Sequence, residues 1–328
     1  MSKFAAGIYR RVAPFLLGAS GQPRLSILIY HRVMPLRDPM RPGEPTAQEF
    51  DWQMRIIREY FSPLPLVEAV LRMRSGTLPQ GAVCVTFDDG YADNETCAMP
   101  VLKKYAIPAT VFVTTGFLNG GRMWNDTVTE SLRDYGEDVL DLRDLGLDCY
   151  SLRSNEERVV AVDNILRTIK HLDPKERLSR VNEIEKRGGD LPCNLMLTDA
   201  QIQSLARNSV SIGAHTVNHP ILSSIADADA RIEIGDSKRY LESLLQRELE
   251  VFAYPNGRPN IDYGAKHLNL VKELGFKAAV STHWGVGTDQ SDIYQLPRFT
   301  PWDRHPMKFG VRLLANYRRV DPLIAAGG

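Results

Sequence analysis

The sequence AVCVTFDDGYADN, residues 82–94, joins a short apolar run to two adjacent acidic side chains. Residues 83–87 have the composition of a buried β-strand, and Asp88, Asp89 and Gly90 follow directly. Neighbouring side chains of a strand point to opposite faces, so the two carboxylates can converge only if the chain turns after them, as Gly90 permits. We therefore predict two carboxylates at the carboxyl end of a strand, where their repulsion calls for a cation or a shared proton. The alternative is a solvated turn.

Apolar runs of this kind alternate with helix-forming segments through most of the chain. The β-like runs are residues 25–30, 83–87, 109–114, 210–213, 250–253, 277–281 and 293–299. One helix is predicted to start at residue 46. Further helices are predicted at residues 66–74, 95–105, 198–208, 227–248, 263–274 and 307–317. Two of them start with a capping box, at Thr46 with Glu49 and at Thr198 with Gln201. About seven strands separated by helices favour a distorted (β/α) barrel of parallel strands.

The alternation stops between about residues 120 and 197, where charged residues and helix formers dominate and no β run is evident. Residues 155–169 and 174–186 have the pattern of amphipathic helices. We interpret this stretch as a helical insertion on one loop of a barrel that covers residues 25–318. Residues 1–24 are then an N-terminal segment with some character of an amphipathic helix, and residues 319–328 are a C-terminal tail.

The overall composition excludes several classes of partner. The 328 residues are 43% hydrophobic and 24% charged, and Lys plus Arg equal Asp plus Glu at 40 each, so no basic field attracts nucleic acid. The four cysteines form no C-x-x-C pair, which favours reduced packing residues. No run approaches the roughly 20 apolar residues of a membrane span. We expect a cytoplasmic protein whose basic N-terminal segment rests on protein or on the anionic surface of the inner membrane.

A second polar cluster follows another predicted strand. Residues 211–220 read SIGAHTVNHP and place His215 and His219 four positions apart. On a helical turn this spacing puts both imidazoles on one side, and it is common among paired metal ligands. In a parallel barrel this cluster and the acidic pair open onto the same face. One carboxylate with two imidazoles would leave coordination positions open, and the second carboxylate could act as a base. Two polar loop histidines are the alternative.

The two motifs together resemble a known family. TFDDGY at residues 86–91, followed far downstream by HTVNHP at residues 215–220, is similar to the polysaccharide deacetylases of carbohydrate esterase family four, which share the NodB-homology domain. LIYHRV at residues 28–33, FAYPNG at residues 252–257 and LPR at residues 296–298 resemble further motifs of one bacterial branch. The resemblance covers about residues 26–301 and is weakest in the insertion.

This resemblance implies a ligand set and a mechanism. Asp89, His215 and His219 would hold a divalent metal, zinc in the first place and Co²⁺, Ni²⁺, Mn²⁺ or Fe²⁺ as alternatives. The metal would lower the pKa of its water, and Asp88 would accept the proton as that water attacks the acetamide of an N-acetylated sugar. A backbone N–H of residue 256 or 257 would stabilise the oxyanion.

The chain departs from the family at two positions. Many members orient the base with an arginine where this chain has an apolar residue at position 252 or 253, so Arg298 is our candidate for holding Asp88 ionised. A surface arginine is the alternative. The family's Leu-x-His motif, which supplies a histidine acid, is missing, and we expect His31, or second to it His305, to take this place.

Several other residues are predicted to contact the substrate. The oxyanion donor is expected from Asn256 or Gly257. Aromatic rings near the barrel mouth can stack on sugar faces, although each can equally be a packing residue. The candidates are Tyr91, Trp124 and Tyr254, with Trp284 and Trp302 after them, and Trp124 is the first choice.

These patterns predict a metal-dependent hydrolase that removes N-acetyl groups from an amino-sugar polysaccharide or from a glycan precursor. Two alternatives stay open. One is a sugar-binding pseudoenzyme that retains the metal, which the absent Leu-x-His motif allows. The other is a non-haem iron oxygenase, because two histidines and one carboxylate also form that facial triad. The oxygenase would give Asp88 no role.

Overall fold

The structure is a computed structural model that describes residues 23–320 and 324–325. The predicted N-terminal helix lies outside the described residues except for its last two positions, and most of the tail does so too. Both stay predictions. Among the residues that are described, no helix is both long and apolar enough to cross a membrane.

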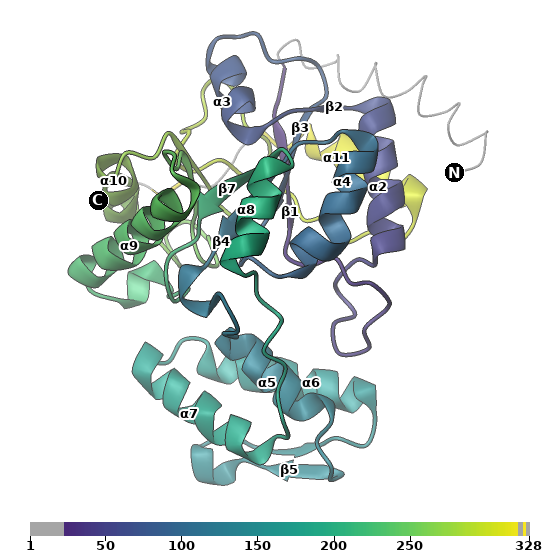
Figure 1. Cartoon of the computed structure of the whole chain (residues 1–328), viewed down its shortest axis with the longest axis vertical. Coiled ribbons are helices and arrows are strands. Elements are labelled where there is room, and N and C mark those ends of the chain that lie inside the picture. Colours follow the sequence, from purple (N-terminus) through teal and green to yellow (C-terminus); the bar gives the residue numbers. More distant parts are fainter. Residues whose placement is uncertain (1–22, 321–323, 326–328) are drawn as a thin grey trace.

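The centre of the fold is a parallel sheet with the strand order β1-β3-β4-β7-β8-β9, and β2 pairs with β3 outside this path. The strands curve into a half-barrel with helices around it (Figure 1), so the predicted distorted (β/α) barrel is confirmed. Their bounds are β1 Ser26–Tyr30, β2 Ser62–Pro63, β3 Ala82–Phe87, β4 Ala109–Val113, β7 Val210–Ala214, β8 Val251–Ala253 and β9 Ala278–Val280. Strands β1, β3 and β4 are buried along their whole length, which explains their continuous apolar composition.

The predicted number of strands is right, but one strand of the sheet was not predicted and one predicted run is not a strand. Strand β2 is only two residues long and contains Pro63, so it had no recognisable sequence signal. The last predicted run, residues 293–299, is not a strand. It forms two isolated bridges, from Leu296 to Val280 of β9 and from Phe299 to Leu28 of β1. This segment therefore joins the two outer strands of the half-barrel.

Helices cover the outside of the sheet. They are α2 Ala47–Tyr60, α3 Leu66–Arg74, α4 Met99–Tyr105, α8 Asp199–Arg207, α9 Asp227–Leu245, α10 Ala265–Glu273 and α11 Pro306–Asn316, with short 3₁₀ turns at Thr115–Phe117 and Leu222–Ser224. Both predicted capping boxes are confirmed. A π-helical turn, Asn94–Ala98, precedes α4, and Pro100 lies in the first turn of α4, where its missing N–H costs nothing.

Most of the chain between β4 and α8 forms a separate body below the sheet (Figure 1). It contains α5 Trp124–Arg133, β5 Val139–Asp141, β6 Cys149–Ser151, α6 Asn155–Ile169 and α7 Pro174–Arg187, around an apolar core of its own. Our expectation that this insertion has no β-structure is wrong, because β5 and β6 pair antiparallel. Each has three residues of which only the middle one, Leu140 or Tyr150, is buried, and so short an alternation is not recognisable.

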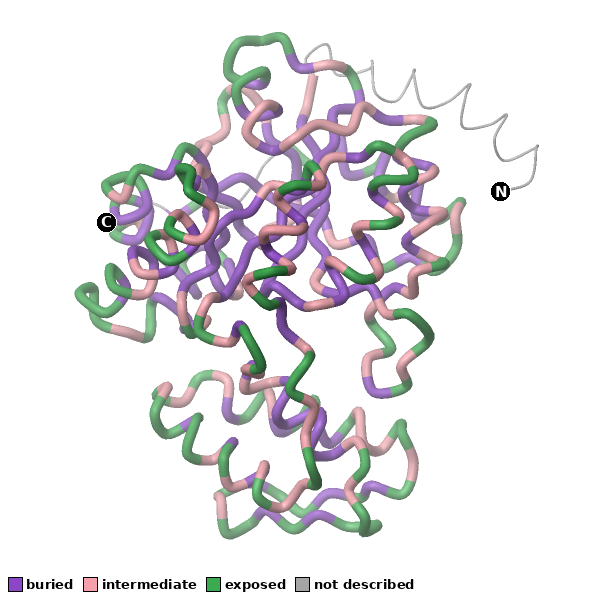
Figure 2. The backbone as a smooth tube through the Cα atoms, viewed as in Figure 1, coloured by how far each residue is buried: buried purple, intermediate pink, exposed green. Residues whose placement is uncertain are grey.

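The insertion is tied to the sheet by the loop that precedes α2. Met40 of this loop is buried in the core of the insertion, and Asp38 accepts two hydrogen bonds of 2.8 Å from Arg133 of α5. Figure 2 shows the buried strands of the main body and the largely exposed outer helices of the insertion. The junction between the two bodies is where the site lies.

Candidate metal centre

Asp88 and Asp89 lie at the carboxyl end of β3, as predicted. The backbone N–H of Asp88 still donates to Tyr30 O of β1 at 2.9 Å, so the ladder continues to this residue. Asp89 itself adopts φ +74°, and Gly90 follows with φ +85°. The turn therefore starts one residue earlier than we expected from Gly90 alone. A left-handed aspartate costs conformational energy, and such strain is characteristic of functional sites.

Asp89, His215 and His219 converge on one point. The distance from Asp89 Oδ1 to Nε2 is 3.5 Å for both histidines, and the three ligand atoms lie within 4.8 Å of one another. Asp89 Oδ1 is buried and has no hydrogen-bond partner among the described residues. A buried carboxylate oxygen without a partner is costly unless a cation binds it. One carboxylate oxygen and two imidazole nitrogens are suitable ligands for zinc and related divalent ions, so these residues fit a metal.

His215 is oriented by the strand that follows it in the sheet. It stands directly after β7, and its Nδ1 lies 2.7 Å from Ala253 O of β8. This carbonyl can only accept, so Nδ1 carries the proton and the lone pair of Nε2 points toward Asp89. A backbone carbonyl in this role is a common outer partner of metal-binding histidines.

His219 does not reach the site by way of a helical turn, and our explanation of the four-residue spacing is wrong. Residues 215–220 form a bend in which Thr216 and His219 are left-handed, with φ of +68° and +52°. Thr216 Oγ1 accepts a hydrogen bond of 3.1 Å from His219 N. The loop nevertheless brings the two imidazole rings to a centroid distance of 4.8 Å.

Glu233 of α9 holds this loop, and sequence reasoning missed it. Its Oε2 accepts from Val217 N at 2.9 Å and from Asn218 N at 2.8 Å, and its Oε1 accepts from Asn218 Nδ2 at 2.8 Å. One carboxylate thus satisfies three donors of the loop between the two histidines. An acidic residue in a long helix carries no local signal of such a contact.

The electrostatics put the ligands in their metal-binding forms. Burial raises the pKa of Asp89, but the interactions with the neighbouring His215 and His219 side chains outweigh it, so the net pKa is well below the ordinary range. Burial lowers the pKa of His219 to about 4 although Asp89 opposes this shift. At neutral pH the carboxylate is ionised and this imidazole is neutral, as metal binding requires.

Arg298 lies against the second carboxylate. Its Nη1 donates to Asp88 Oδ1 at 2.7 Å and its Nη2 to Asp88 Oδ2 at 2.6 Å, and the arginine is fully buried. Its Nε donates to Ser281 O at 2.8 Å, which fixes the plane of the guanidinium. Burial raises the pKa of Asp88, but the charge and the hydrogen bonds of Arg298 lower it below its ordinary value. The surface-arginine alternative is thereby excluded.

The two candidate proton donors lie in different places. His31 lines the cavity that contains the metal ligands, and its pKa is raised because the charges of Asp89 and Asp88 outweigh the lowering effect of burial. His305 does not line this cavity. It is the N-cap of α11, and its Nδ1 accepts a hydrogen bond of 3.2 Å from Met307 N.

The two candidate oxyanion donors, both in the loop after β8, differ in whether their N–H group already has an acceptor. Gly257 N already donates to Pro255 O at 2.6 Å. Asn256 lines the cavity, and its N–H has no acceptor within the described part of the chain. Asn256 is thus the available donor of the pair.

Only some of the aromatic candidates line the cavity. Tyr91 and Trp124 line the cavity. Tyr254 is fully buried against Tyr263, with a ring distance of 3.9 Å, so its predicted contact with a glycan is wrong. Trp284 and Trp302 pack on each other at 4.6 Å away from the cavity.

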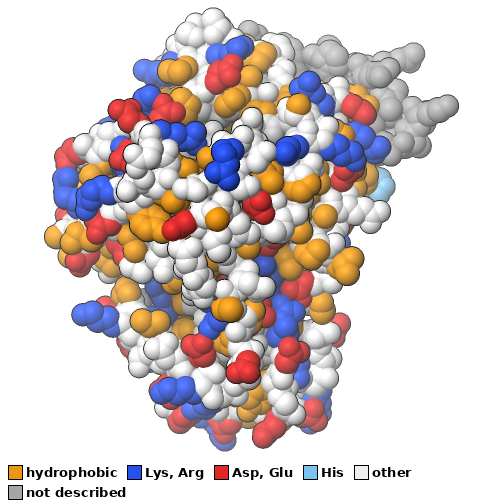
Figure 3. All heavy atoms as spheres, in the orientation of Figure 1, with side chains coloured by type: hydrophobic (Ala, Val, Ile, Leu, Met, Phe, Trp, Pro, Cys, Tyr) orange, Lys and Arg blue, Asp and Glu red, His pale blue; other side chains and the backbone are white. Residues whose placement is uncertain are grey.

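The cavity has a volume of about 1030 Å³ and lies between the sheet and the insertion. The carboxyl ends of the strands contribute the candidate metal ligands, and α5, α6 and α7 contribute the opposite wall. Charged side chains of both signs are visible around this junction in Figure 3.

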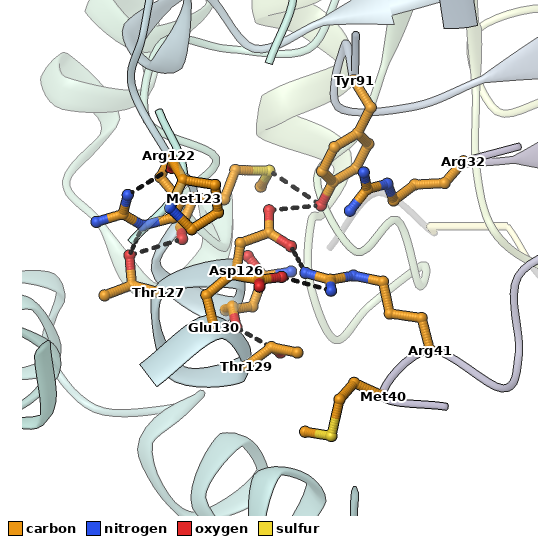
Figure 4. Close-up of polar contacts among 12 residues, drawn as sticks. Arg32, Met40, Arg41, Tyr91, Arg122, Met123, Asp126, Thr127, Thr129 and Glu130 are labelled. Atoms are coloured by element: carbon orange, nitrogen blue, oxygen red, sulfur yellow. Dashed lines mark hydrogen bonds and ion pairs between the residues drawn. The ribbon is translucent and has the colours of Figure 1, made fainter. Parts of the chain in front are cut away.

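A buried polar network connects the metal centre to the insertion (Figure 4). Tyr91, two residues after Asp89, donates from its hydroxyl to Asp126 Oδ2 of α5 at 2.9 Å. Arg41 of the loop before α2 donates to Asp126 at 2.8 Å and to Glu130 at 2.6 Å. These contacts join three segments that are distant in the sequence, and they fix the wall of the cavity relative to the ligands.

Fold and site together define an α/β half-barrel protein with a two-histidine, one-aspartate candidate metal centre at the carboxyl ends of its strands. The family described as polysaccharide deacetylase matches residues 75–142 and 163–279. The chain therefore belongs to the polysaccharide deacetylase family, as its motifs predicted.

Individual relatives are distant. The Bacillus subtilis protein YxkH is 23% identical over 280 residues, which are 84% of this chain and 70% of YxkH. The poly-β-1,6-N-acetyl-D-glucosamine N-deacetylase of Staphylococcus aureus strain MSSA476 is 23% identical over 77% of this chain, and the match spans 66% of that enzyme.

Two solved structures share the fold. The Streptococcus pyogenes deacetylase PplD, in complex with acetate, aligns with a TM-score of 0.60 and 21% identity over 89% of this chain and 99% of PplD. IcaB from Ammonifex degensii aligns with a TM-score of 0.57 and 19% identity, over 88% and 96% of the two chains.

Replacing Arg298 by Met should destabilise the protein by about 3–5 kcal/mol, because it leaves the Asp88 carboxylate buried without its counter-charge. Urea unfolding measures this loss. The double variant with Asp88→Asn should lose less than the sum of the two single variants. Arg72→Met is the matched control, because Arg72 and Glu68 form an exposed pair expected to contribute less than about 1 kcal/mol. An equal loss in both arginine variants would contradict the expectation.

Replacing Glu233 by Ala should weaken zinc binding about 10–100-fold, because the loop between the two histidines loses the acceptor for three donors. Competition with a chromogenic chelator measures the affinity. Asp236→Asn, on the same helix and paired with Arg239, is the control and should bind zinc normally. Unchanged affinity in Glu233→Ala would show that the loop holds its shape without this residue.

Proposed function

We propose that this protein is a metal-dependent hydrolase that removes N-acetyl groups from an amino-sugar polysaccharide or a glycan precursor. Membership of the family supports the reaction class. The Staphylococcus aureus relative acts on a polymer of N-acetyl-D-glucosamine by its name, which supports an N-acetylated glycan as the substrate. The observation that carries the proposal is the arrangement of two carboxylates with different partners, Asp89 beside two imidazoles and Asp88 on Arg298.

Asp89, His215 and His219 are the residues that would hold the metal. A divalent ion there supplies Lewis-acid chemistry, which polarises a carbonyl and lowers the pKa of water. Zinc suits this donor set, and Co²⁺, Ni²⁺, Mn²⁺ and Fe²⁺ accept the same ligands.

The other residues of the site handle protons and charge. Asp88 is ionised and lies with its Oδ2 4.0 Å from His215 Nε2, so it can accept the proton of a water molecule at the centre. Arg298 keeps both oxygens of Asp88 in one orientation. The N–H of Asn256 is free to donate to the oxygen that becomes negative when water adds to the acetamide carbonyl.

Cleavage of the amide C–N bond then needs a proton for the leaving amine. His31 lines the same cavity and is the residue we assign to this step, since the neighbouring carboxylates favour its protonated form. The products are acetate and the free amino sugar. Trp124 and Tyr91 are the aromatic residues in position to contact the sugar.

The alternatives differ in what they require of Asp88. An iron oxygenase needs no second carboxylate and leaves the Asp88–Arg298 pair without a role, and neither the family nor the solved neighbours support it. A sugar-binding pseudoenzyme would keep the metal centre but release no acetate.

Acetate release from N-acetylglucosamine oligomers tests the proposal. We expect the zinc-loaded wild type to release acetate and Asp88→Asn to be slower by about 10²–10⁴-fold, because the general base is lost. Metal content is measured in both and should be equal. Asp141→Asn, on the exposed edge of the insertion, is the control and should react normally. A wild type that binds metal but releases no acetate from any amino-sugar substrate would support the pseudoenzyme, and normal turnover by Asp88→Asn would refute its role as base.

A further inference from the structure

The wall of the cavity opposite Asp89 and the two histidines carries three cations that form no ion pair among the described residues, and one of them, Arg167, is exposed. Lys170, at the end of α6, and Arg177, in α7, line the same cavity as Asp88, Asp89 and the histidines. Arg177 also lines a second cavity of about 920 Å³ between α7 and the start of α9. Trp124 lines both cavities as well, and the Arg177 guanidinium lies 4.8 Å from the centre of its ring.

Arg177 is buried, with 7% of its surface exposed. Its Nη1 donates to Lys170 O at 3.1 Å, which accounts for one of its five N–H donors. No carboxylate in the described residues forms an ion pair with it. Asp173, one turn earlier, is the N-cap of α7 and accepts from the N–H groups of Lys175 and Glu176 instead. A guanidinium held by cation–π contact and left with free donors is suited to bind a carboxylate or a phosphate.

Lys170 is similarly without a partner among the described residues. Burial lowers the pKa of Lys170, the charge of Asp262 opposes this shift, and the charges of Arg258 and Arg177 add to it. Arg177 and Arg258 are thus each close enough to Lys170 for their charges to disfavour its protonated form. Asp163 also lines this wall, but it is exposed and pairs with neither cation.

Two further arginines of the cavity, the buried Arg32 and the half-buried Arg41, are different. Arg32 pairs with Asp93 at 2.7 Å, and Arg41 pairs with Asp126 and Glu130 (Figure 4). Their charges are neutralised within the protein and serve to hold segments together. Capping of the α6 carboxyl end explains one hydrogen bond of Arg177, but it explains neither its remaining donors nor the charge of Lys170.

We propose that Lys170 and Arg177 form an anion-binding subsite, so that the preferred substrate carries a negatively charged group, carboxylate or phosphate, close to the N-acetylated sugar. This inference rests on the proposed function and adds the substrate class. The anion would lie on the insertion side of the cavity, on the guanidinium that stacks on Trp124, while the acetamide lies at the metal ligands.

Three N-acetylated substrates test this inference: a neutral N-acetylglucosamine tetramer, a tetrasaccharide of alternating glucuronic acid and N-acetylglucosamine, and an N-acetylglucosaminyl diphosphate ester of a short isoprenoid alcohol. For the wild type, kcat/KM for at least one charged substrate should exceed that for the neutral tetramer by about tenfold or more. The charged substrate that is favoured identifies the anion as carboxylate or phosphate.

Lys170→Gln and Arg177→Gln should each lower this preference about tenfold, whereas Arg177→Lys should retain part of it. Arg180→Gln is the matched control, because Arg180 lies one turn further along α7, pairs with Glu176 and lines neither cavity. Arg177→Gln can destabilise the end of α6. If it fails to fold, Lys170→Gln decides, because the Lys170 side chain forms no hydrogen bond or ion pair with the described residues.

Equal kcat/KM for neutral and charged substrates in the wild type would overturn the subsite, and so would an equal loss on both kinds of substrate in Lys170→Gln. Neither result affects the proposed deacetylation. If no substrate releases acetate, the proposed function fails, and calorimetric binding of the charged and neutral oligomers to the wild type and to Lys170→Gln then decides on the subsite alone.

Discussion

The rest of the site depends on how the fold separates two adjacent carboxylates. Asp88 and Asp89 would repel each other if both pointed the same way without a counter-charge. Asp88 completes the strand ladder and lies on Arg298, whereas Asp89 leaves the strand in a left-handed conformation and lies between two imidazoles. The strain of Asp89 is therefore the local cost of giving one strand end two different electrostatic partners.

The same segment of the chain closes the sheet and orients Asp88. The segment that bridges β9 and β1, through Leu296 and Phe299, is the segment that carries Arg298 between these two contacts. A buried arginine needs its carboxylate as much as the carboxylate needs the arginine, so closure of the half-barrel and ionisation of Asp88 support each other. The contacts of Arg298 with Asp88 support our prediction that it substitutes for the arginine that many family members have at the position of residue 252 or 253, in β8.

Local patterns were enough to predict most of the strands, both capping boxes and the convergence of the acidic pair with the two histidines, because each motif follows directly from one strand end. The assignment of Asp89 as the ligand came from the family resemblance. Long-range contacts were not predictable. Glu233 holds a loop that precedes it by fifteen residues, and Arg41 joins a helix more than eighty positions away. Tyr254 was misassigned because composition does not show which face of a short segment is buried, and β5 and β6 were too short to recognise.

The two walls of the cavity contribute residues that are held in different ways. Residues at strand ends are fixed by the hydrogen bonds of the sheet, which suits groups that must meet a reacting bond within a few tenths of an ångström. The insertion has its own core and is attached through Met40, Arg41 and α5, so its surface can change without disturbing the sheet. Reaction chemistry then belongs to the sheet side, and the choice among glycans belongs to the side that holds Trp124, Lys170 and Arg177.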